Sequence, residues 1–432
     1  MTTSAPREYI PLPTQRRNLL FVVLDGVAIG LMSAASSFVS VLVIHLGASP
    51  VWVSLLSSLP NAVGLGMTLP WARFAERRQG RPQALYAWSR LAVHLVYPLV
   101  ALVPLFLTGT LSAQVIVIVW ALSAFPSSLS NLMFTVVMGH AATPERRAFQ
   151  MSRRWMFMGV ANMVSLPLAS LLIGGVTFPR GYQILYASNF AIALFAFYCA
   201  QHIHVERRVS QVSAGRLPLA GRVRQGIAEL VSEKPFLTFI SGKAAYNLGL
   251  SMVSALIPIF WLKTLQVSDS WVGYFNTAAA AATLISYVPW VRYKRRYGTR
   301  PVLILSAAGS ALYPALLTLA RGPIGVLPVV ALNGLVAGGL NLALFDGLLD
   351  VCPRDREERF IAINLTALQL VGVAGPPLGA ALLSVLDIRW VMAIASGVAL
   401  VGAAIFAFAR SGKEVTASPA QPASSQTTGV PG

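Results

Sequence analysis

The chain alternates between long hydrophobic runs and short polar segments rich in basic residues. Twelve of the runs reach the length of about 20 residues that a helix needs to cross the hydrocarbon core of a bilayer. We expect membrane-spanning helices at residues 19–44, 51–71, 84–108, 112–138, 155–176, 183–201, 236–262, 270–291, 301–320, 323–349, 360–386 and 389–409. The pattern predicts an all-α membrane protein with twelve transmembrane helices.

Composition narrows the class of protein further. Of the 432 residues, 56% are hydrophobic and only 11% are charged. A soluble fold of this size carries about twice that charged fraction and cannot bury so much apolar side chain. The composition therefore excludes a soluble enzyme and a disordered scaffold. The two cysteines, Cys199 and Cys352, are too few for a disulfide framework.

The basic residues are distributed unevenly between the two sides of the predicted spans. With the N-terminus placed inside, 27 of the 33 Lys and Arg fall in the two tails and the inside loops. The outside loops hold four, Arg180, Lys263, Arg321 and Arg389, and Arg90 and Lys243 fall within predicted helices. By the positive-inside rule we expect a multi-pass protein of the bacterial inner (plasma) membrane with both termini in the cytoplasm. The basic clusters then face membrane lipids, and nucleic acid is not an expected partner.

The spans divide into two sets of six. We expect a cytoplasmic N-tail at 1–18, a first six-helix bundle at 19–201 and a cytoplasmic linker at 202–235. A second six-helix bundle follows at 236–410, and the Ser-, Thr- and Pro-rich segment 411–432 reads as a disordered tail.

The two sets repeat each other in sequence. Trp52 and Trp71 recur as Trp271 and Trp290 at an offset of 219, and Gly30 and Gly249 keep that offset. Further along, Asn131 and Pro167 match Asn341 and Pro377 at an offset of 210. Ordered self-similarity of this kind predicts two copies of one six-helix unit in the same topology.

A six-plus-six chain with a long basic middle loop resembles the major facilitator superfamily over about residues 15–410. The superfamily's loop motif between helices 2 and 3 has the form G-x-x-x-D-R-x-G-R-R. Arg78, Gly80 and Arg81 match it, and Arg296 and Gly298 match in the second copy, while Arg77 and Arg295 occupy the acidic position. The resemblance implies a fold of two bundles whose helices 1, 4, 7 and 10 line a central cavity.

Three charged residues fall within predicted helices 1, 7 and 10. Asp25, Lys243 and Asp346 each lie roughly 9–10 Å inside the cytoplasmic boundary, at 1.5 Å per residue. Charges in a membrane are costly and often functional, so we expect a role in proton coupling or gating. We also expect Asp25 and Lys243 to face the central cavity and to interact when the cytoplasmic side is closed. The alternative is that these side chains only extend toward the inner interface.

Uncharged polar residues supply a second group of candidates. A substrate site near the midplane between repeats would draw on such groups, although they equally suit helix–helix hydrogen bonds. The candidates for the substrate cavity are Ser127, Asn131, Tyr246, Asn247 and Asn341. The five histidines have no metal-ligand spacing, and we expect neither a metal nor a cofactor.

The pattern favours a secondary active transporter that moves a small, neutral or amphipathic molecule by alternating access. Sugar phosphates and dicarboxylates usually need several cavity Arg or Lys, and only Lys243 is available. Proton-coupled efflux is the narrower hypothesis, and an uptake permease for an organic solute is the alternative. A lipid-moving or non-transporting membrane protein is the alternative from another class. The chain lacks the P-loop and hydrolase motifs, so we expect no enzyme, and we expect a monomer.

Overall fold

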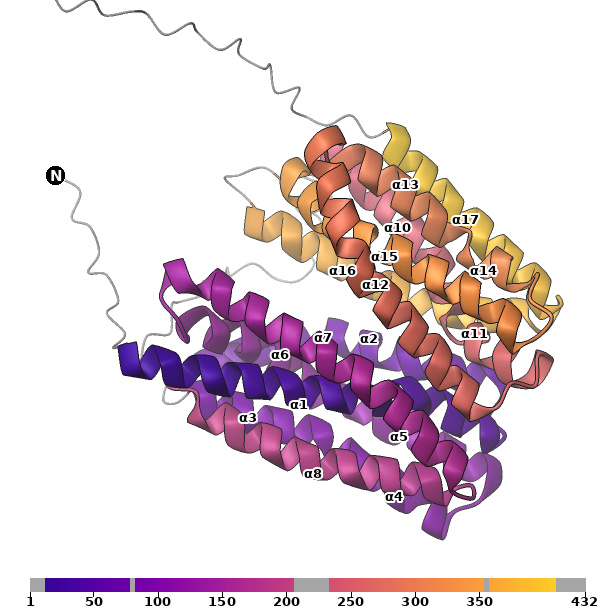
Figure 1. The fold of residues 1–432 in the computed structure, drawn as a ribbon, viewed down its shortest axis with the longest axis horizontal. Coiled ribbons are helices and arrows are strands. Elements are labelled where there is room, and N and C mark those ends of the chain that lie inside the picture. The colour runs from indigo at the N-terminus through magenta and orange to yellow at the C-terminus, as the bar shows by residue number, and fades with distance from the viewer. Residues whose placement is uncertain (1–11, 78–81, 206–232, 353–356, 409–432) are drawn as a thin grey trace, which may run out of the picture.

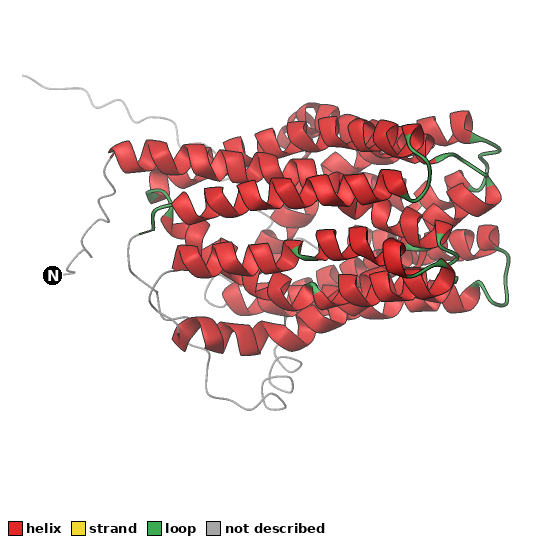
Figure 2. Cartoon of the chain, turned by 90° about the horizontal axis from the view of Figure 1, so that it is seen from below, coloured by secondary structure: helices red, strands yellow, loops and turns green. Residues whose placement is uncertain are grey.

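The computed structural model describes residues 12–77, 82–205, 233–352 and 357–408. Every regular element among these residues is helical (Figure 2). The first motif copy, with Arg78, Gly80 and Arg81, lies outside the described residues. The two tails and most of the predicted linker also lie outside them.

The first half of the chain forms eight helices that pack together. They are α1 (Leu12–His45), α2 (Pro50–Arg77), α3 (Pro82–His94), α4 (Val96–Phe106), α5 (Gly109–Leu122), α6 (Ala124–His140), α7 (Pro144–Gly175) and α8 (Arg180–His202). In the second half the elements are α10 (Lys234–Ser254), α11 (Leu256–Ile259), a π-helical turn (Phe260–Thr264), α12 (Asp269–Tyr297), α13 (Thr299–Ala311), α14 (Tyr313–Leu317), α15 (Pro323–Val351), α16 (Glu357–Leu382) and α17 (Ile388–Phe408).

Four of the predicted spans are each broken into consecutive helices. The first helix of each pair ends at His94, Leu122, Ser254 or Ala311. A proline follows within four residues in each case: Pro98, Pro126, Pro258 and Pro314. Proline has no N–H for the carbonyl four residues earlier, so each span bends where that hydrogen bond is missing.

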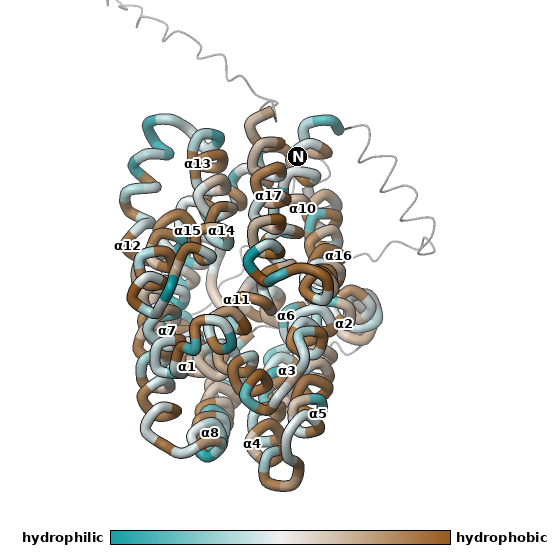
Figure 3. The backbone as a smooth tube through the Cα atoms, turned by 90° about the vertical axis from the view of Figure 1, so that its right-hand side faces the viewer, coloured by the Kyte–Doolittle hydropathy of each residue, from teal (hydrophilic) through white to brown (hydrophobic). Residues whose placement is uncertain are grey.

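Ten spans among the described residues have the length and hydropathy for crossing a membrane. The other two predicted spans form α2 and α12, which are 28 and 29 residues long. Their sequences match in the repeat, and each contacts the opposite half, α2 against α16 and α12 against α7. Hydrophobic residues recur along the helices of both halves (Figure 3). Large side chains such as Phe106 and Leu105 are 79% and 63% exposed, as expected for a surface that faces lipid.

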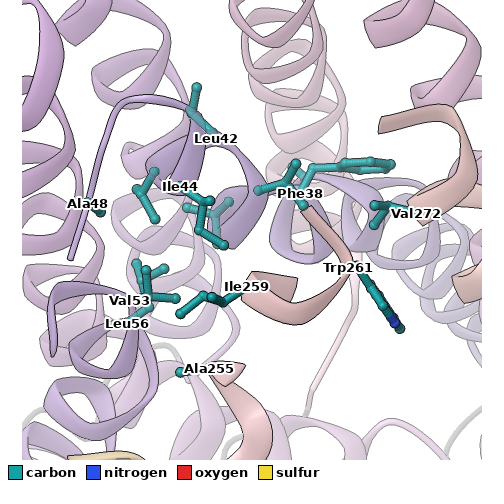
Figure 4. Close-up of a cluster of buried hydrophobic side chains, with 14 of the residues drawn as sticks. Phe38, Leu42, Ile44, Ala48, Val53, Leu56, Ala255, Ile259, Trp261 and Val272 are labelled. Atoms are coloured by element: carbon teal, nitrogen blue, oxygen red, sulfur yellow. The ribbon is translucent and has the colours of Figure 1, made fainter. Parts of the chain in front are cut away.

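The hydrophobic core is shared between the halves at only one end. We call the end where α1 begins at Leu12 the proximal end, and the end that contains His45 the distal end. The largest cluster contains Phe38 and Val53 from the first half and Ile259 and Val272 from the second (Figure 4). Two smaller clusters each belong to a single half. The halves therefore converge at the distal end and diverge toward the proximal end (Figure 1).

The sequence repeat is also present in the side-chain contacts. The indole N–H of Trp71 donates to the carbonyl of Phe125 at 2.8 Å. In the second half the indole N–H of Trp290 donates to the carbonyl of Leu335 at 2.7 Å. The donors are offset by 219 and the acceptors by 210, the two offsets that the sequence shows. Matched residues therefore make matched bonds.

Candidate functional site

A cavity of about 770 Å³ lies within the described residues, mainly inside the first half. Its walls come from α1, α2, α3 to α6 and, from the second half, α16. Ser127 and Asn131 line it. Tyr246, Asn247 and Asn341 are not among the lining residues, because α10 and α15 do not reach this cavity. A substrate-binding role stays a prediction for all five residues.

Asp25 lies in a buried ionic cluster within the first half. Its carboxylate is 0% exposed and pairs with Arg90 of α3 through Oδ1. Arg154 of α7 reaches Oδ2 from the other side at 3.2 Å, and the hydroxyl of Tyr86 lies 3.4 Å from the same oxygen. Two guanidinium groups therefore face one carboxylate, with a tyrosine hydroxyl beside them.

Two glycines allow this cluster to form. A Cβ at Gly26 would lie 2.8 Å from Cγ of Arg154, and a Cβ at Gly30 would lie 2.2 Å from the carbonyl oxygen of Met158. Because both positions lack a side chain, α7 approaches α1 closely, as in small-xxx-small helix pairs. That approach brings the guanidinium of Arg154 to Asp25.

Lys243 has a different environment in the second half. Its side chain is 8% exposed, and Nζ donates to Oδ1 of Asn364 on α16 at 3.0 Å. The ring of Phe239 lies 6.0 Å from Nζ. Among the described residues no carboxylate lies within ion-pair distance of Lys243.

These two sites occupy nearly equivalent positions of the repeat. Asp25 matches position 244, next to Lys243, at the offset of 219. Arg154 matches Asn364 at the offset of 210. One buried polar pair therefore joins α1 to α7 in the first half, and another joins α10 to α16 in the second half. The charges of the two pairs differ.

The expectation that Asp25 faces the central cavity is wrong, because its carboxylate is buried against α3 and α7. In this structure Asp25 and Lys243 each bond within their own half and do not contact one another. Asp346 pairs instead with Lys294 of α12, and both side chains are about one-third exposed. In the second motif copy, Gly298 ends α12 with a φ of +84°, and Arg296 lies over the ring of Tyr297.

Polar contacts join the two halves at the distal end. Nε2 of His45 lies 2.6 Å from Oδ1 of Asp269, and the hydroxyl of Tyr182 donates to Oδ2 at 2.7 Å. The hydroxyl of Ser170 donates to the carbonyl of Ser270 at 2.8 Å. Since Asp269 and Ser270 begin α12, that helix is held against both α1 and α7 at this end.

We compared the chain with known protein families and curated proteins. The family model described as Major Facilitator Superfamily matches residues 239–430. The second half of the chain therefore resembles the proteins of this superfamily. No curated protein sequence matched the chain.

Solved structures show that both halves have a fold found in known transporters. The nucleoside transporter NupG has a TM-score of 0.68 at 12% identity, covering 91% of this chain and 99% of its own. A bacterial homologue of the human lysosomal transporter Spinster, inward-facing and occupied, has a TM-score of 0.68 at 13% identity, with coverages of 93% and 97%. A bacterial homologue of the iron transporter ferroportin, inward-facing, has a TM-score of 0.67 at 14% identity, with coverages of 94% and 100%. The family match and these structures share the fold of multi-pass membrane transporters.

Several residues that meet at these sites were not among the candidates from the sequence. Arg90 lies within α3, seven residues into the predicted span 84–108, and this position inside a hydrophobic span was the available signal. Arg154, one residue before span 155–176, gave a weaker signal. His94 lies one turn after Arg90 and lines the cavity.

Proposed function

We propose that the protein is a secondary active transporter of the inner membrane that moves a small, uncharged solute by alternating access. The observation that carries this proposal is the shape of the core. The halves share one hydrophobic cluster at the distal end, have separate clusters at the proximal end, and enclose a cavity between α16 and the first half. Two halves that share a core at the distal end and separate toward the proximal end have the form that alternation of two bundles requires.

The orientation of the protein is part of this proposal. The bias of basic residues supports a proximal end in the cytoplasm, so that the structure is open inward. A cysteine at Gly298 should then react with an impermeant maleimide only from the cytoplasmic side, and one at Gly322 only from outside. The opposite result would invert the orientation.

The distal end offers a direct test of alternation. A Cβ at Gly174 would lie 3.8 Å from Cβ of Ser270, within the range of a disulfide. We suggest the variant Gly174→Cys/Ser270→Cys with Asn131→Cys as a reporter in the cavity, in a background with Cys199→Ala and Cys352→Ala. Modification of position 131 by an impermeant maleimide is quantified by peptide mass from each side of the membrane, so no solute is needed.

Alternation predicts that position 131 reacts from both sides when the distal pair is reduced. Oxidation should abolish reaction from outside, leave reaction from the cytoplasmic side, and be reversed by a reductant. Each single distal cysteine is the matched control and should have no effect. Reaction from one side only, under all conditions, would contradict alternating access.

The proposal also covers the energy source that drives transport. We infer proton coupling, with Asp346 and Lys243 as the groups to test first, because Asp25 is enclosed by two guanidiniums. Asp346→Asn and Lys243→Met should each weaken the response of transport to a pH gradient, and an unchanged response in both would contradict coupling at these residues. Assays in vesicles of both orientations distinguish efflux from uptake.

A further inference from the structure

The walls of the cavity are uncharged. Among the described residues that line it there is no Asp, Glu, Lys or Arg. A charged solute that moved from water into this cavity would find no counterion there. That transfer costs far more free energy than the transfer of a neutral polar group. The lining therefore selects against ions, while its serines and its amides Asn61, Asn131 and Gln369 suit a solute with several hydrogen-bonding groups.

One wall of the cavity is aromatic. The imidazole of His94 lies nearly parallel to the ring of Tyr97, with centroids 5.4 Å apart and an interplanar angle of 12°. Trp120 lines the same cavity. Flat π-surfaces favour stacking or edge contact with another planar ring over contact with a flexible chain.

His94 differs from several serines of the cavity in its side-chain hydrogen bonds. The hydroxyls of Ser33 and Ser128 already donate to the carbonyls of Gly30 and Ala124 on their own helices. The side chain of His94 makes no hydrogen bond within the described part of the chain, and its buried Nδ1 has no partner there. A buried polar atom without a hydrogen bond is unfavourable in a folded protein. His94 lines the cavity, and an imidazole whose Nδ1 is buried still has Nε2 to bond a solute.

The second half contributes to the same cavity through Gln369. A Cβ at Gly64 of α2 would lie 3.3 Å from Nε2 of Gln369, so the amide reaches the wall of the first half. A solute that contacts His94 on one side and Gln369 on the other would touch both halves. Its binding would then depend on their relative position, as transport by alternation requires.

We propose that His94 determines the specificity of this cavity, and that the cavity takes an uncharged solute combining a planar ring with hydroxyl or amide groups. This inference rests on the proposed function and names its substrate class. Nε2 of His94 hydrogen-bonds the solute, while the stacked pair of His94 and Tyr97 orients its ring.

The test is a binding measurement on the purified full chain in detergent, by isothermal titration. The probes are uridine and adenosine, which carry a planar base and sugar hydroxyls without charge. Uridine 5′-monophosphate adds only the charged group, and D-ribose lacks the planar base. We expect binding of at least one nucleoside and affinities at least tenfold weaker for the monophosphate and for ribose.

Two substitutions separate a role in binding from a structural role. His94→Phe keeps a flat ring against Tyr97 but removes both nitrogens, and it should weaken nucleoside binding about tenfold or more, the effect of one buried hydrogen bond. It should not lower the unfolding temperature of the solute-free protein, because no hydrogen bond inside the fold is lost. His94→Asn restores a polar group and should recover part of the affinity.

The matched control is His202→Phe. The ring of His202 packs on Tyr198, and its Nδ1 bonds the carbonyl of Tyr198 at 2.8 Å, far along the chain from the cavity lining. This change should lower the unfolding temperature and leave nucleoside binding unaltered.

Each part of the inference can be overturned separately. Failure of both nucleosides to bind the wild type would refute the substrate class, and equal binding of the monophosphate would refute the exclusion of charge. Wild-type affinity in His94→Phe, or a lowered unfolding temperature in that variant, would make His94 structural. The cysteine test of alternation uses no solute, so failure here leaves that result independent.

Discussion

The two halves of this transporter share one repeat but bury different chemistry at matched positions. In the first half Asp25 of α1 meets Arg154 of α7, and Arg90 joins them. In the second half Lys243 of α10 meets Asn364 of α16, without a carboxylate among the described residues. Both halves therefore hold a buried polar pair between two helices at nearly equivalent positions, but the charges of the partners differ.

This difference gives the halves different tolerance to substitution. A buried carboxylate between two guanidiniums cannot be removed without leaving buried cations unpaired. A buried lysine with only an amide partner is itself the unfavourable group. The first half should therefore depend on its pair for stability, whereas the second half should not.

The largest predicted effect is that of Asp25→Asn. This change leaves Arg90 and Arg154 without a counterion, and we expect a loss of about 3–5 kcal/mol in the free energy of unfolding. Lys243→Met replaces a buried cation by an apolar chain of similar length and should be neutral or stabilising. Denaturant unfolding of both variants in detergent micelles, followed by circular dichroism, measures the difference.

Arg154→Met provides the control for this comparison. It leaves the pair of Asp25 and Arg90 intact, so its cost should fall between those of the other two variants. If Lys243→Met were as destabilising as Asp25→Asn, the claimed asymmetry between the halves would be wrong.

A smaller effect is expected at the glycines that bring the helices together. A Cβ at Gly30 would lie 2.2 Å from the carbonyl oxygen of Met158, and one at Gly249 would lie 2.4 Å from that of Ala395. Gly30→Ala and Gly249→Ala should each cost about 1–3 kcal/mol, because backbone must move. Gly397→Ala in α17 meets nothing within 4 Å and should be stabilising by up to about 1 kcal/mol.

The glycine series also sharpens the comparison of the halves. Gly30 packs on α7, whereas Gly249, its match in the repeat, packs on α17. Only Gly30→Ala should disturb an ion pair, that of Asp25 and Arg154. The loss in unfolding free energy that Gly30→Ala causes should therefore be smaller when Asp25→Asn is already present. Simple additivity of the two changes would show that the α1–α7 approach does not hold Arg154 at Asp25.

The smallest effect is expected where the halves are alike. Trp71→Phe and Trp290→Phe each remove one indole-to-carbonyl hydrogen bond, worth about 1 kcal/mol. Because the bonds are matched, at 2.8 and 2.7 Å, the two losses in unfolding free energy should agree within about 0.5 kcal/mol. A loss in one variant alone would show that the repeat does not extend to these contacts.

The sequence predicted the helical fold and its duplication because hydropathy and spacing are local properties. The runs between Leu12 and Phe408 locate the helices, and the tryptophan and proline matches reveal the repeat. The split spans were not predicted, although the prolines that cause them are visible in the sequence.

The partners of the buried charges were not predicted, because they depend on packing between distant helices. Asp25 and Arg154 are 129 residues apart, and only the close approach at Gly26 and Gly30 joins them. The position of the cavity within the first half, and the hydrogen-bond deficit of His94, likewise follow from three-dimensional packing. Ser127 and Asn131 could be named as candidates because they lie on a polar stretch of a hydrophobic span.

The measurement that tests the account most directly follows both ends of α7 and α12 by pulsed electron paramagnetic resonance. One spin-label pair replaces Ser152 and Arg295 at the proximal end, and the other replaces Thr177 and Ser268 at the distal end. Alternating movement of two rigid halves predicts two populations at each end, with the proximal pair short when the distal pair is long. Opposite shifts of the two populations after formation of the 174–270 disulfide would support it. A single, unchanging distance at both ends, with or without the disulfide, would contradict it.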